Sequence, residues 1–543
     1  MTVEQLASCD DLEVVRAAAL RQAATLAEHA TTVAQLTEDN AKLQQQNDWL
    51  SKQVFGKKAE RYVDPNQQAL AFTTDGEHEA VTDGSPDDEA TETVTYTRKK
   101  PKNRGKRQPI PDHWPRIERL HDLPDDQKTD LATGEPLRRI GEKTSEQVDF
   151  IPPQIRVIRH VRPIYALPGE NLDGNTPEVI TAPRPQEGLS KCLASPGLLA
   201  HIAVSKYADH LPLYRLEKIF KRSGFELDPT SMGRWMQGIG EIAEPLIALM
   251  KRRMLEHSHV IQSDETPVRQ QDPGRGSTKE CRFWPYLGQP GTAGHYVLFD
   301  YTQGRGGEHP RQWFEDAQGK ALFAGGVLQG DGYAGTNRLF EPDGKWRMTR
   351  VGCWAHARRK FFDAKQSSHT QSKHALEAIQ QLYTVERDAK ELDADDRQRK
   401  RQEHATPIVN AFFAWCREQK PRTLPKSALG KAITYALNQE ATLRVYLDDG
   451  DVQIDNNACE RSLRGIGIGR KNWLFIGSPR GGLAAARLFS LLGSAKLHDV
   501  EPLAYLTDLI TRLPAEAKKE DAGVEAFLPD VWAVANPTSV ALG

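Results

Sequence analysis

The sequence predicts an α/β protein in which a long helical segment interrupts the strand-forming part of the chain. Two observations lead to this fold class. Between residues 259 and 356, short runs rich in β-branched and aromatic residues have the composition of strands. After them, polar residues with helical character continue almost without a break through residues 357–450. A chain of 543 residues is too long for one hydrophobic core, so about three or four domains are expected.

The order of the strand-like runs defines the domain more closely. One helical stretch, residues 309–317, falls between the third and the fourth run. Three strands, a helix, a fourth strand and further α and β elements describe an α/β domain of ribonuclease H type with a helical insertion. We expect this domain to cover residues 258–480, with the insertion at about 357–452. The predicted strands are 259–269, 281–288, 295–302, 326–333 and 350–356.

Residues 1–62 are predicted to form a helix that self-associates as a coiled coil. Leucines recur every seven residues, and a second position three residues before each leucine holds Val or Asn. Asn at such a position favours a two-stranded parallel coiled coil at some cost in stability. An ordinary amphipathic helix is the alternative. The leucines are Leu36, Leu43 and Leu50, and the second positions are Val33, Asn40 and Asn47.

Residues 63–112 are predicted to be a disordered charged linker. Acidic residues gather between Asp75 and Glu92, and seven of the ten residues in 98–107 are basic. Apolar residues are too few in this stretch to pack a core. The basic block is either an arm that contacts a DNA backbone or a solvated spacer.

Residues 113–190 are predicted to form a small β-containing domain. Ile155, Val157 and residues 160–164 have strand-like composition and are bounded by prolines. The pattern then becomes helical from about residue 196.

Residues 191–257 are predicted to form a helical domain. One helix is expected to end at Gly224, and a second, capped by Ser231, is expected to run from 232 to 255. Two helices joined by a short polar turn are either a helix-turn-helix for DNA or a plain packing unit. Residues 481–543 are expected to be a helical C-terminal tail.

The composition excludes several classes of protein. Hydrophobic residues make up 38% and charged residues 27% of the chain, which suits a soluble protein. No apolar run approaches the roughly 20 residues of a membrane span, and no secretory signal is evident. Six cysteines without a CxxC pair fit a reducing cytoplasm rather than a disulfide framework. The net charge of −2 averages over uneven segments, so it does not exclude a nucleic-acid partner.

Three acidic residues are candidates for metal-dependent chemistry. Asp264 and Asp331 each end an apolar strand, and Glu460 stands at the start of a basic helix. Aspartates at the ends of neighbouring strands can meet at one edge of a sheet, although each alone can equally form a turn or cap a helix. Three carboxylates together suit Mg²⁺ or Mn²⁺, which take oxygen ligands and stabilise the reacting oxygens of a phosphoryl transfer.

The residues around Glu460 support both a functional and a structural interpretation. With Asn457 as N-cap, Glu460 is the third residue of its helix. Asn456 and Arg464 lie four residues to either side and share its face, which would offer a carboxylate to metal and polar groups to phosphate. Arg461 points about 100° away around the helix. In the structural alternative, Glu460 closes a capping box and pairs with Arg464.

Basic residues in two motifs are candidates for DNA contact. The motif at 353–363 lies at a strand-to-helix junction, where it forms either a phosphate cradle or a solvated helix face. The motif GIGIGR, at 465–470, lacks the third glycine and the flanking strand of a nucleotide-binding loop, so its glycines are expected to end the helix near DNA. We expect no zinc at His356, for want of a Cys or His partner at ligand spacing. The predicted DNA-binding residues are His356, Arg358, Arg359, Arg461, Arg464, Arg470 and Lys471.

These motifs resemble, in order and over nearly the whole chain, those of transposases of the insertion sequence 66 family. The resemblance rests on the opening helix with LSKQVFGKKAERY, and on SDETP, GDGYAGT, GCWAHARRKFFDA, DNNACERSLR and GRKNWLFIGSPRGG. It implies a DDE-type cut-and-join enzyme with a ribonuclease H fold, and it assigns the acids to Asp264, Asp331 and Glu460. It also implies DNA at the element's ends and at the target as partner, with helper proteins of the same element as further candidates.

One departure from that family concerns zinc. Family members usually hold zinc through CxxC pairs that flank the small domain, which resembles GEKTSEQVDFIPPQIRVIRHVRPIYAL here. The corresponding flanking stretches of this sequence contain no cysteine. We therefore expect a zinc-free variant that is held together by its own packing.

Three functions are compatible with these residues. A DNA transposase would hydrolyse a phosphodiester at the element's end, and the freed 3′-hydroxyl would attack target DNA. A related nuclease or resolvase would cut without joining, and an inactive DNA-binding protein would keep only the fold. A bacterial protein in the cytoplasm, associated with the nucleoid, is expected in each case. Cleavage and joining assays with Mg²⁺ or Mn²⁺ distinguish the three.

Overall fold

A computed structural model describes most of the chain beyond residue 192 and a few shorter stretches before it. In the N-terminal segment, the described residues between 24 and 40 are helical, and Val33 and Leu36 each have an exposed fraction of 62%. Self-association of this helix stays a prediction. The rest of 1–62, the linker and most of 113–190 lie outside the described residues. Those residues are 24–25, 28–33, 35–36, 39–40, 155–166, 179–181, 188–189, 192–274, 276–519 and 521–537.

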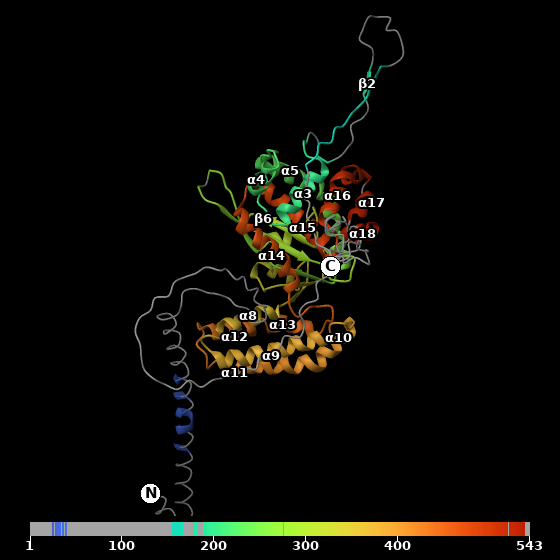
Figure 1. Cartoon of the computed structure of the whole chain (residues 1–543). Helices are drawn as coiled ribbons and strands as arrows, with labels where there is room; N and C mark the ends of the chain where they lie inside the picture. Colours follow the sequence, from blue (N-terminus) through green and yellow to red (C-terminus); the bar gives the residue numbers. More distant parts are fainter. Residues whose placement is uncertain are drawn as a thin grey trace, which may run out of the picture. The chain divides into compact units, whose positions relative to one another are not determined.

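A mixed sheet of seven strands organises the middle of the chain (Figure 1). The long strand β5 pairs antiparallel with β6 along one edge and with both β3 and β4 along the other. Only Asp264 and Glu265 separate β3 from β4. The bounds are β3 (Val260–Ser263), β4 (Thr266–Gln270), β5 (Lys279–Leu287), β6 (Val297–Thr302), β7 (Val327–Gln329), β8 (Thr349–Val351) and β9 (Phe475–Ile476).

The parallel half of the sheet brings the two candidate aspartates to one edge. β3 pairs parallel with β7, with Gln262 opposite Gln329, and β7 pairs parallel with β8. Asp264 and Asp331 each lie two residues after one of these paired glutamines. Both aspartates therefore lie at the same edge of the sheet, as expected from their places at strand ends. The strand expected at 350–356 is wrong in length, because β8 ends at Val351 and a helix begins at Trp354.

Helices from both sides of the sheet-forming segment share one hydrophobic core with the strands. Ser490 and Ser494 of helix α15 accept hydrogen bonds from the backbone of β6, at 2.8 and 3.0 Å. α15 also crosses α5 closely, since a Cβ on Gly240 would lie 2.8 Å from the backbone of Ala484. The core therefore continues across the predicted boundaries at residues 257 and 480. The helices are α3 (Pro196–Tyr207), α4 (Leu213–Arg222), α5 (Pro229–Ile242), α6 (Glu244–His257), α7 (Glu308–Trp313), α14 (Asn457–Trp473), α15 (Pro479–Leu497), α16 (Pro502–Glu516), α17 (Asp521–Val524) and α18 (Pro529–Ala535).

The helices before the sheet agree with the prediction in one respect and differ from it in two. α4 ends before Gly224, whose φ of 78° suits glycine, as expected. The cap of α5 is Asp228 rather than Ser231, because the Asp228 carboxylate accepts the Ser231 backbone N–H at 2.9 Å. The single helix predicted over 232–255 is two helices that break at Ala243. Pro245 lacks an N–H and so is tolerated in the first turn of a new helix.

The insertion is helical, as predicted, and its helices form a second hydrophobic core together with Val260, Val327 and Val351 of the sheet. Its helices lie side by side in Figure 1. The guanidinium of Arg401 is fully buried among them, where it donates to both oxygens of Glu386 and to the carbonyls of Tyr446 and Asp449. The helices are α8 (Trp354–Ala364), α9 (His369–Asp388), α10 (Ala394–Lys400), α11 (Thr406–Gln419), α12 (Ala428–Asn438) and α13 (Glu440–Arg444).

The small β unit is shorter than predicted. β1 (Ile164–Ala166) pairs antiparallel with β2 (Val179–Thr181), but residues 155–163 have no strand partner among the described residues. Val157 has an exposed fraction of 92% and Val161 one of 77%. Their β-favouring composition alone does not make a strand, because strand stability comes from pairing and side-chain packing.

Candidate active site

Asp264 and Asp331 line the same small pocket at the carboxyl ends of β3 and β7. The pocket has a volume of about 40 Å³. The two strands approach closely here, since a Cβ on Gly330 would lie 3.0 Å from the carbonyl oxygen of Ser263. Each aspartate also accepts a local backbone hydrogen bond, from Glu265 at 2.7 Å and from Tyr333 at 2.9 Å. Each Asp therefore bonds to a local turn, as the alternative interpretation expected. The two side chains nevertheless line the same pocket.

Glu460 lies in the first turn of α14, one position further along than predicted. The helix begins at Asn457 with Asn456 as the N-cap residue, and the Glu460 N–H bonds to the Asn456 carbonyl at 3.0 Å. The expectation that Asn456 faces phosphate is wrong, because this side chain is fully buried. Its amide points to the Ser263 carbonyl at 3.5 Å, so it packs the start of α14 against the end of β3.

The charges of Asp331 and Glu460 act on the Asp264 carboxyl group. Burial raises the pKa of Asp264 to about 7; a backbone hydrogen bond from Glu265 opposes this rise, and the negative charges of Asp331 and Glu460 add to it. Like charges that share a site disfavour the ionised form, and a bound cation would reverse that effect. Asp264 and Asp331 therefore share one pocket, and the charge of Glu460, which is far away in the sequence, also acts on Asp264.

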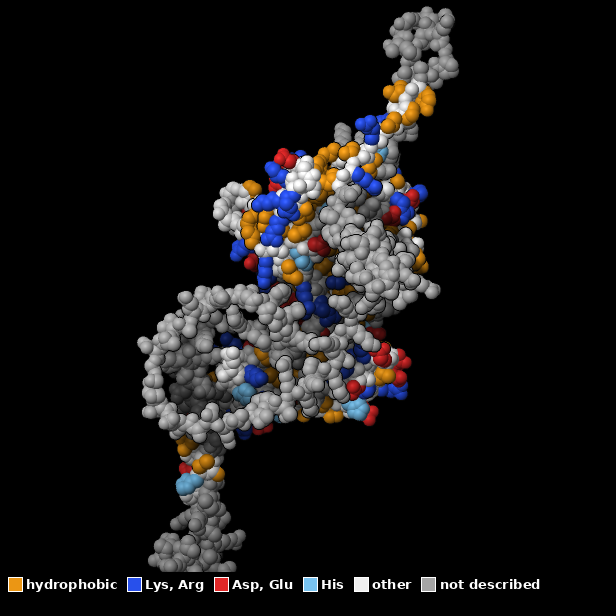
Figure 2. Space-filling view, viewed as in Figure 1, with side chains coloured by type: hydrophobic (Ala, Val, Ile, Leu, Met, Phe, Trp, Pro, Cys, Tyr) orange, Lys and Arg blue, Asp and Glu red, His pale blue; other side chains and the backbone are white. Residues whose placement is uncertain are grey.

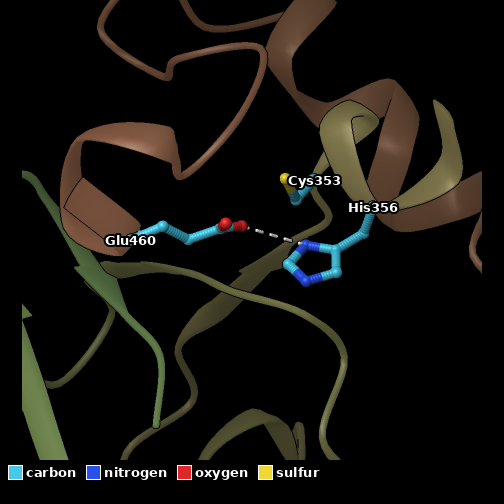
Figure 3. Close-up of side chains that lie close together, drawn as sticks. All are labelled: Cys353, His356 and Glu460. Carbon is cyan, nitrogen blue, oxygen red and sulfur yellow. Dashed lines mark ion pairs between the residues drawn. The ribbon is translucent and has the colours of Figure 1, made fainter. Parts of the chain in front are cut away.

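The Glu460 carboxylate faces helix α8 and does not cap its own helix. Its Oε1 lies 3.5 Å from Nδ1 of His356 (Figure 3). Its Oε2 lies 3.3 Å from Nη2 of Arg359. The capping-box alternative is therefore wrong, since the side chain spans to another element. The expectation that His356 lacks a cysteine partner is also wrong. Cys353, three residues earlier, has its Sγ in the same cluster, whose ligand atoms lie within 4.8 Å of one another.

Two buried glutamines that the sequence reasoning missed connect these elements. Gln262 donates to the Gln329 side chain at 2.9 Å and to the Asp455 carbonyl at 3.1 Å, and it accepts the Cys459 N–H at 3.3 Å. Gln329 donates to the carbonyl of Gln453 at 2.7 Å. The pair therefore ties the start of α14 to β3 and β7. The signal was present in the sequence, because a glutamine stands two residues before each aspartate in VIQSD and VLQGD.

Arg350 and Arg305 are basic residues near the acids that the sequence reasoning also missed. Arg350 of β8 lines the pocket of Asp264 and Asp331, and burial lowers its pKa while Asp331 opposes that change. Arg305 forms an ion pair with Glu265 and lies over the ring of Tyr333, 4.3 Å from its centroid. No motif in the sequence marks either arginine.

Some of the predicted DNA-binding residues are exposed without an ion-pair partner, whereas others contact residues of the protein. Arg358, Arg461, Arg464 and Lys471 are exposed and form no ion pair with another residue that the structure describes. Arg359 is exposed too, although it contacts Glu460. Arg470 instead donates to the Thr266 hydroxyl at 2.9 Å and the Pro267 carbonyl at 2.7 Å, so it anchors α14 to β4.

The glycines of GIGIGR do not end the helix, contrary to expectation. α14 continues through them to Trp473, and Leu474 follows with a φ of 62°. A Cβ on Gly469 would lie 2.6 Å from the Trp473 indole, and one on Gly465 would lie 3.3 Å from the His210 ring. At these two positions the glycines make room for aromatic rings that pack against the helix.

A second basic surface covers the exposed side of α4 and α5. Leu216 and Phe220 of α4 are buried, and the opposite side of the helix is cationic. Figure 2 shows Lys and Arg side chains, in blue, gathered over these two helices. The exposed basic residues are Arg215, Lys218, Lys221, Arg222 and Arg234.

Four family profiles match the chain. The profile of the "Transposase IS66 family" matches residues 191–484, and the "IS66 C-terminal element" matches 490–529. "Transposase C of IS166 homeodomain" matches 42–119. The "zinc-finger binding domain of transposase IS66" matches 133–166, which is at odds with the expectation of no zinc there. That stretch contains no cysteine and one histidine, His160.

Three proteins of Sinorhizobium fredii, all described as uncharacterised, are similar over most of their length. The protein y4jD is 34% identical over 437 residues, 78% of this chain and 81% of that protein. The protein y4qI is 35% identical over 399 residues, which are 72% of this chain and 71% of that protein. The protein y4hP is 30% identical over 476 residues, which are 82% of this chain and 80% of that protein. No described helix is long and apolar enough to span a bilayer. The IS66 profile covers more than half of the sequence, and the chain therefore belongs to the IS66 family of transposases.

Proposed function

We propose that this transposase is a DDE enzyme in which Asp264, Asp331 and Glu460 bind Mg²⁺ or Mn²⁺, and that it cuts the element's ends and joins them to target DNA. The observation that carries the proposal is that Asp264 and Asp331 line one pocket beyond the ends of the paired strands β3 and β7, with the charge of Glu460 acting on Asp264. Burial and the neighbouring negative charges raise the pKa of Asp264, which an isolated surface carboxylate would not show. A perturbed carboxylate in a cleft with a second acid is typical of a functional site.

The strand order supports a ribonuclease H-like arrangement of the domain. Across the sheet, β5 pairs antiparallel with β6 on one side and with β3 and β4 on the other. β3 then pairs parallel with β7, and β7 pairs parallel with β8. The helical insertion follows β8, and α14 returns the chain to the sheet with Glu460 in its first turn. We keep the segment boundaries expected from the sequence as a description of the order of the parts, while the hydrophobic core continues across those at residues 257 and 480.

The residues fit a hard divalent cation. All three donors are carboxylates, the ligand type that Mg²⁺ and Mn²⁺ prefer. Glu460 Oε1 is buried without a hydrogen-bond partner among the described residues, as is one carboxylate oxygen of neighbouring Glu265. Such orphaned oxygens are costly unless a cation or water satisfies them. When bound, the cation would stabilise negative charge on the attacking and leaving oxygens of a phosphodiester.

Each protein group has a defined part in this proposal. Asp264 and Asp331 present carboxylates from strand ends whose backbones are fixed by the sheet. His356 and Arg359 contact the two oxygens of the Glu460 carboxylate and would position it for the metal. The exposed Arg461 and Arg464 would bind DNA phosphates beside it, and the basic surface of α4 and α5 would contact DNA further away.

The partners follow from family membership and from the proposed chemistry. Membership of a transposase family implies DNA as partner. Self-association through the N-terminal helix and assistance by proteins of the same element belong to the proposal.

The test is cleavage and joining of labelled element-end DNA by Asp264→Asn, Asp331→Asn and Glu460→Gln variants with Mg²⁺ or Mn²⁺. Each change removes one ligand charge and keeps side-chain size, so we expect loss of both products with DNA binding retained. Glu418→Gln, at an exposed position of α11, is the matched control and should remain active. Activity of any of the three variants at the wild-type rate would refute the triad. Cutting without joining by the wild type would favour a nuclease or resolvase, and no metal-dependent product would favour an inactive DNA-binding protein.

A further inference from the structure

A thiol, an imidazole and a carboxylate converge beside the proposed catalytic centre. Cys353 immediately precedes α8, His356 lies in its first turn, and Glu460 comes from α14. Their potential ligand atoms all lie within 4.8 Å of one another (Figure 3). Cys353 is fully buried, and the other two side chains have exposed fractions of 18% and 22%. The cluster is therefore largely enclosed but open to solvent on one side.

The donor set differs from that of the acidic site. Cys sulfur, His nitrogen and a carboxylate oxygen are ligands of Zn²⁺ and related transition metals, whereas Mg²⁺ rarely takes sulfur or nitrogen. Ligands at about 2.0–2.2 Å around a tetrahedral zinc are roughly 3.4 Å apart. The His356 Nδ1 and Glu460 Oε1 atoms lie 3.5 Å apart, and neither has a hydrogen-bond partner among the described residues.

We propose that Cys353, His356 and Glu460 form a binding site for a thiophilic divalent cation of the Zn²⁺ class. The fourth position would be open to water. Because Glu460 serves both sites, an ion held here withdraws it from Asp264 and Asp331 and inhibits the enzyme. The inhibitory part rests on the proposed function, whereas the binding part does not.

The surroundings determine how the ion would enter. The Cys353 thiol would pass its proton to solvent as the metal–sulfur bond forms. Arg359 contacts the other oxygen of Glu460, but 59% of its side chain is exposed, so the guanidinium can turn into solvent. His356 provides its Nδ1 as the neutral imidazole, and burial already lowers its pKa.

The binding test is a Co²⁺ titration of the metal-free full-length protein, followed by absorption spectroscopy. We expect a thiolate-to-cobalt charge-transfer band that is absent in Cys353→Ser and retained in Cys416→Ser, a matched buried thiol of α11. His356→Gln should weaken Co²⁺ binding by at least about tenfold, and it tests the site if the serine variant does not fold. A wild-type protein without the band, or a Cys353→Ser variant that retains it, would overturn the site.

The inhibitory part is tested by Mn²⁺ release, measured by electron paramagnetic resonance of free Mn²⁺. One equivalent of Zn²⁺ should release Mn²⁺ from the wild type and from Cys416→Ser, but not from Cys353→Ser. Mn²⁺ that stays bound to the wild type would overturn the inhibition. If Mn²⁺ never binds while the cobalt band appears, the proposed catalytic metal site fails and the thiophilic site stands.

Discussion

Replacing Gln329 by Met tests whether the buried glutamine pair holds α14 in place. Met keeps the length and approximate volume of the side chain but removes its donors and acceptor. Gln329 is fully buried, donates to the Gln453 carbonyl at 2.7 Å and the Gly352 carbonyl at 3.3 Å, and accepts from Gln262 at 2.9 Å. Its partners would lose these bonds inside the protein.

The magnitude follows from those contacts. A buried polar group left without its partner costs about 1–3 kcal/mol. The Gln453 carbonyl loses a short bond and the Gly352 carbonyl a long one, while Gln262 retains the Asp455 carbonyl. We therefore expect the free energy of unfolding to fall by about 2–4 kcal/mol. Because the pair also positions the start of α14, Mn²⁺ affinity should fall by about tenfold, as is typical when a residue behind a metal ligand is changed.

Urea unfolding of the metal-free protein, followed by circular dichroism, measures the first effect, and Mn²⁺ titration measures the second. Gln318→Met, at an exposed position outside the site, is the matched control and should stay within about 0.5 kcal/mol of the wild type. A Gln329→Met protein as stable as this control would refute the reasoning. If stability falls but Mn²⁺ affinity does not change, the glutamine pair stabilises the fold without positioning the metal site.

Three further predictions concern DNA, assembly and pH. Arg464→Ala should weaken DNA binding and reduce the log–log salt slope by about 0.9, measured by fluorescence anisotropy; an unchanged slope would mean that Arg464 contacts no phosphate. Deleting residues 1–52 should lower the solution mass in light scattering, and an unchanged mass would contradict the coiled coil. Mn²⁺ affinity should rise as the pH increases from about 6 to about 8, because Asp264, with its pKa near 7, must lose its proton to bind the ion. The same raised pKa stabilises the metal-free fold below pH 3.8, and this stabilisation is lost as the pH rises toward 7. Asp264→Asn should remove this contribution to the pH dependence of unfolding, and an unchanged profile would contradict it.

Local sequence patterns were sufficient to identify the elements that carry the acids. Apolar runs that end in aspartate predicted β3 and β7, and the long polar helical stretch predicted the insertion. The order of the strands across the sheet, and the division of the predicted strand 259–269 into β3 and β4, came from the structure. The family was predicted from motifs in order, and four profiles confirm it.

Only the tertiary structure decided how α14 lies and what surrounds Glu460. Glycines weaken an isolated helix, yet α14 continues through Gly465, Gly467 and Gly469; the His210 and Trp473 rings pack where a Cβ would stand at the first and the last of them. Gln262 bonds to Cys459 across 197 residues, and Glu460 meets His356 and Cys353 across the whole insertion. Local propensity acts over a few residues, whereas these contacts depend on where the sheet and the two helices bring distant side chains together.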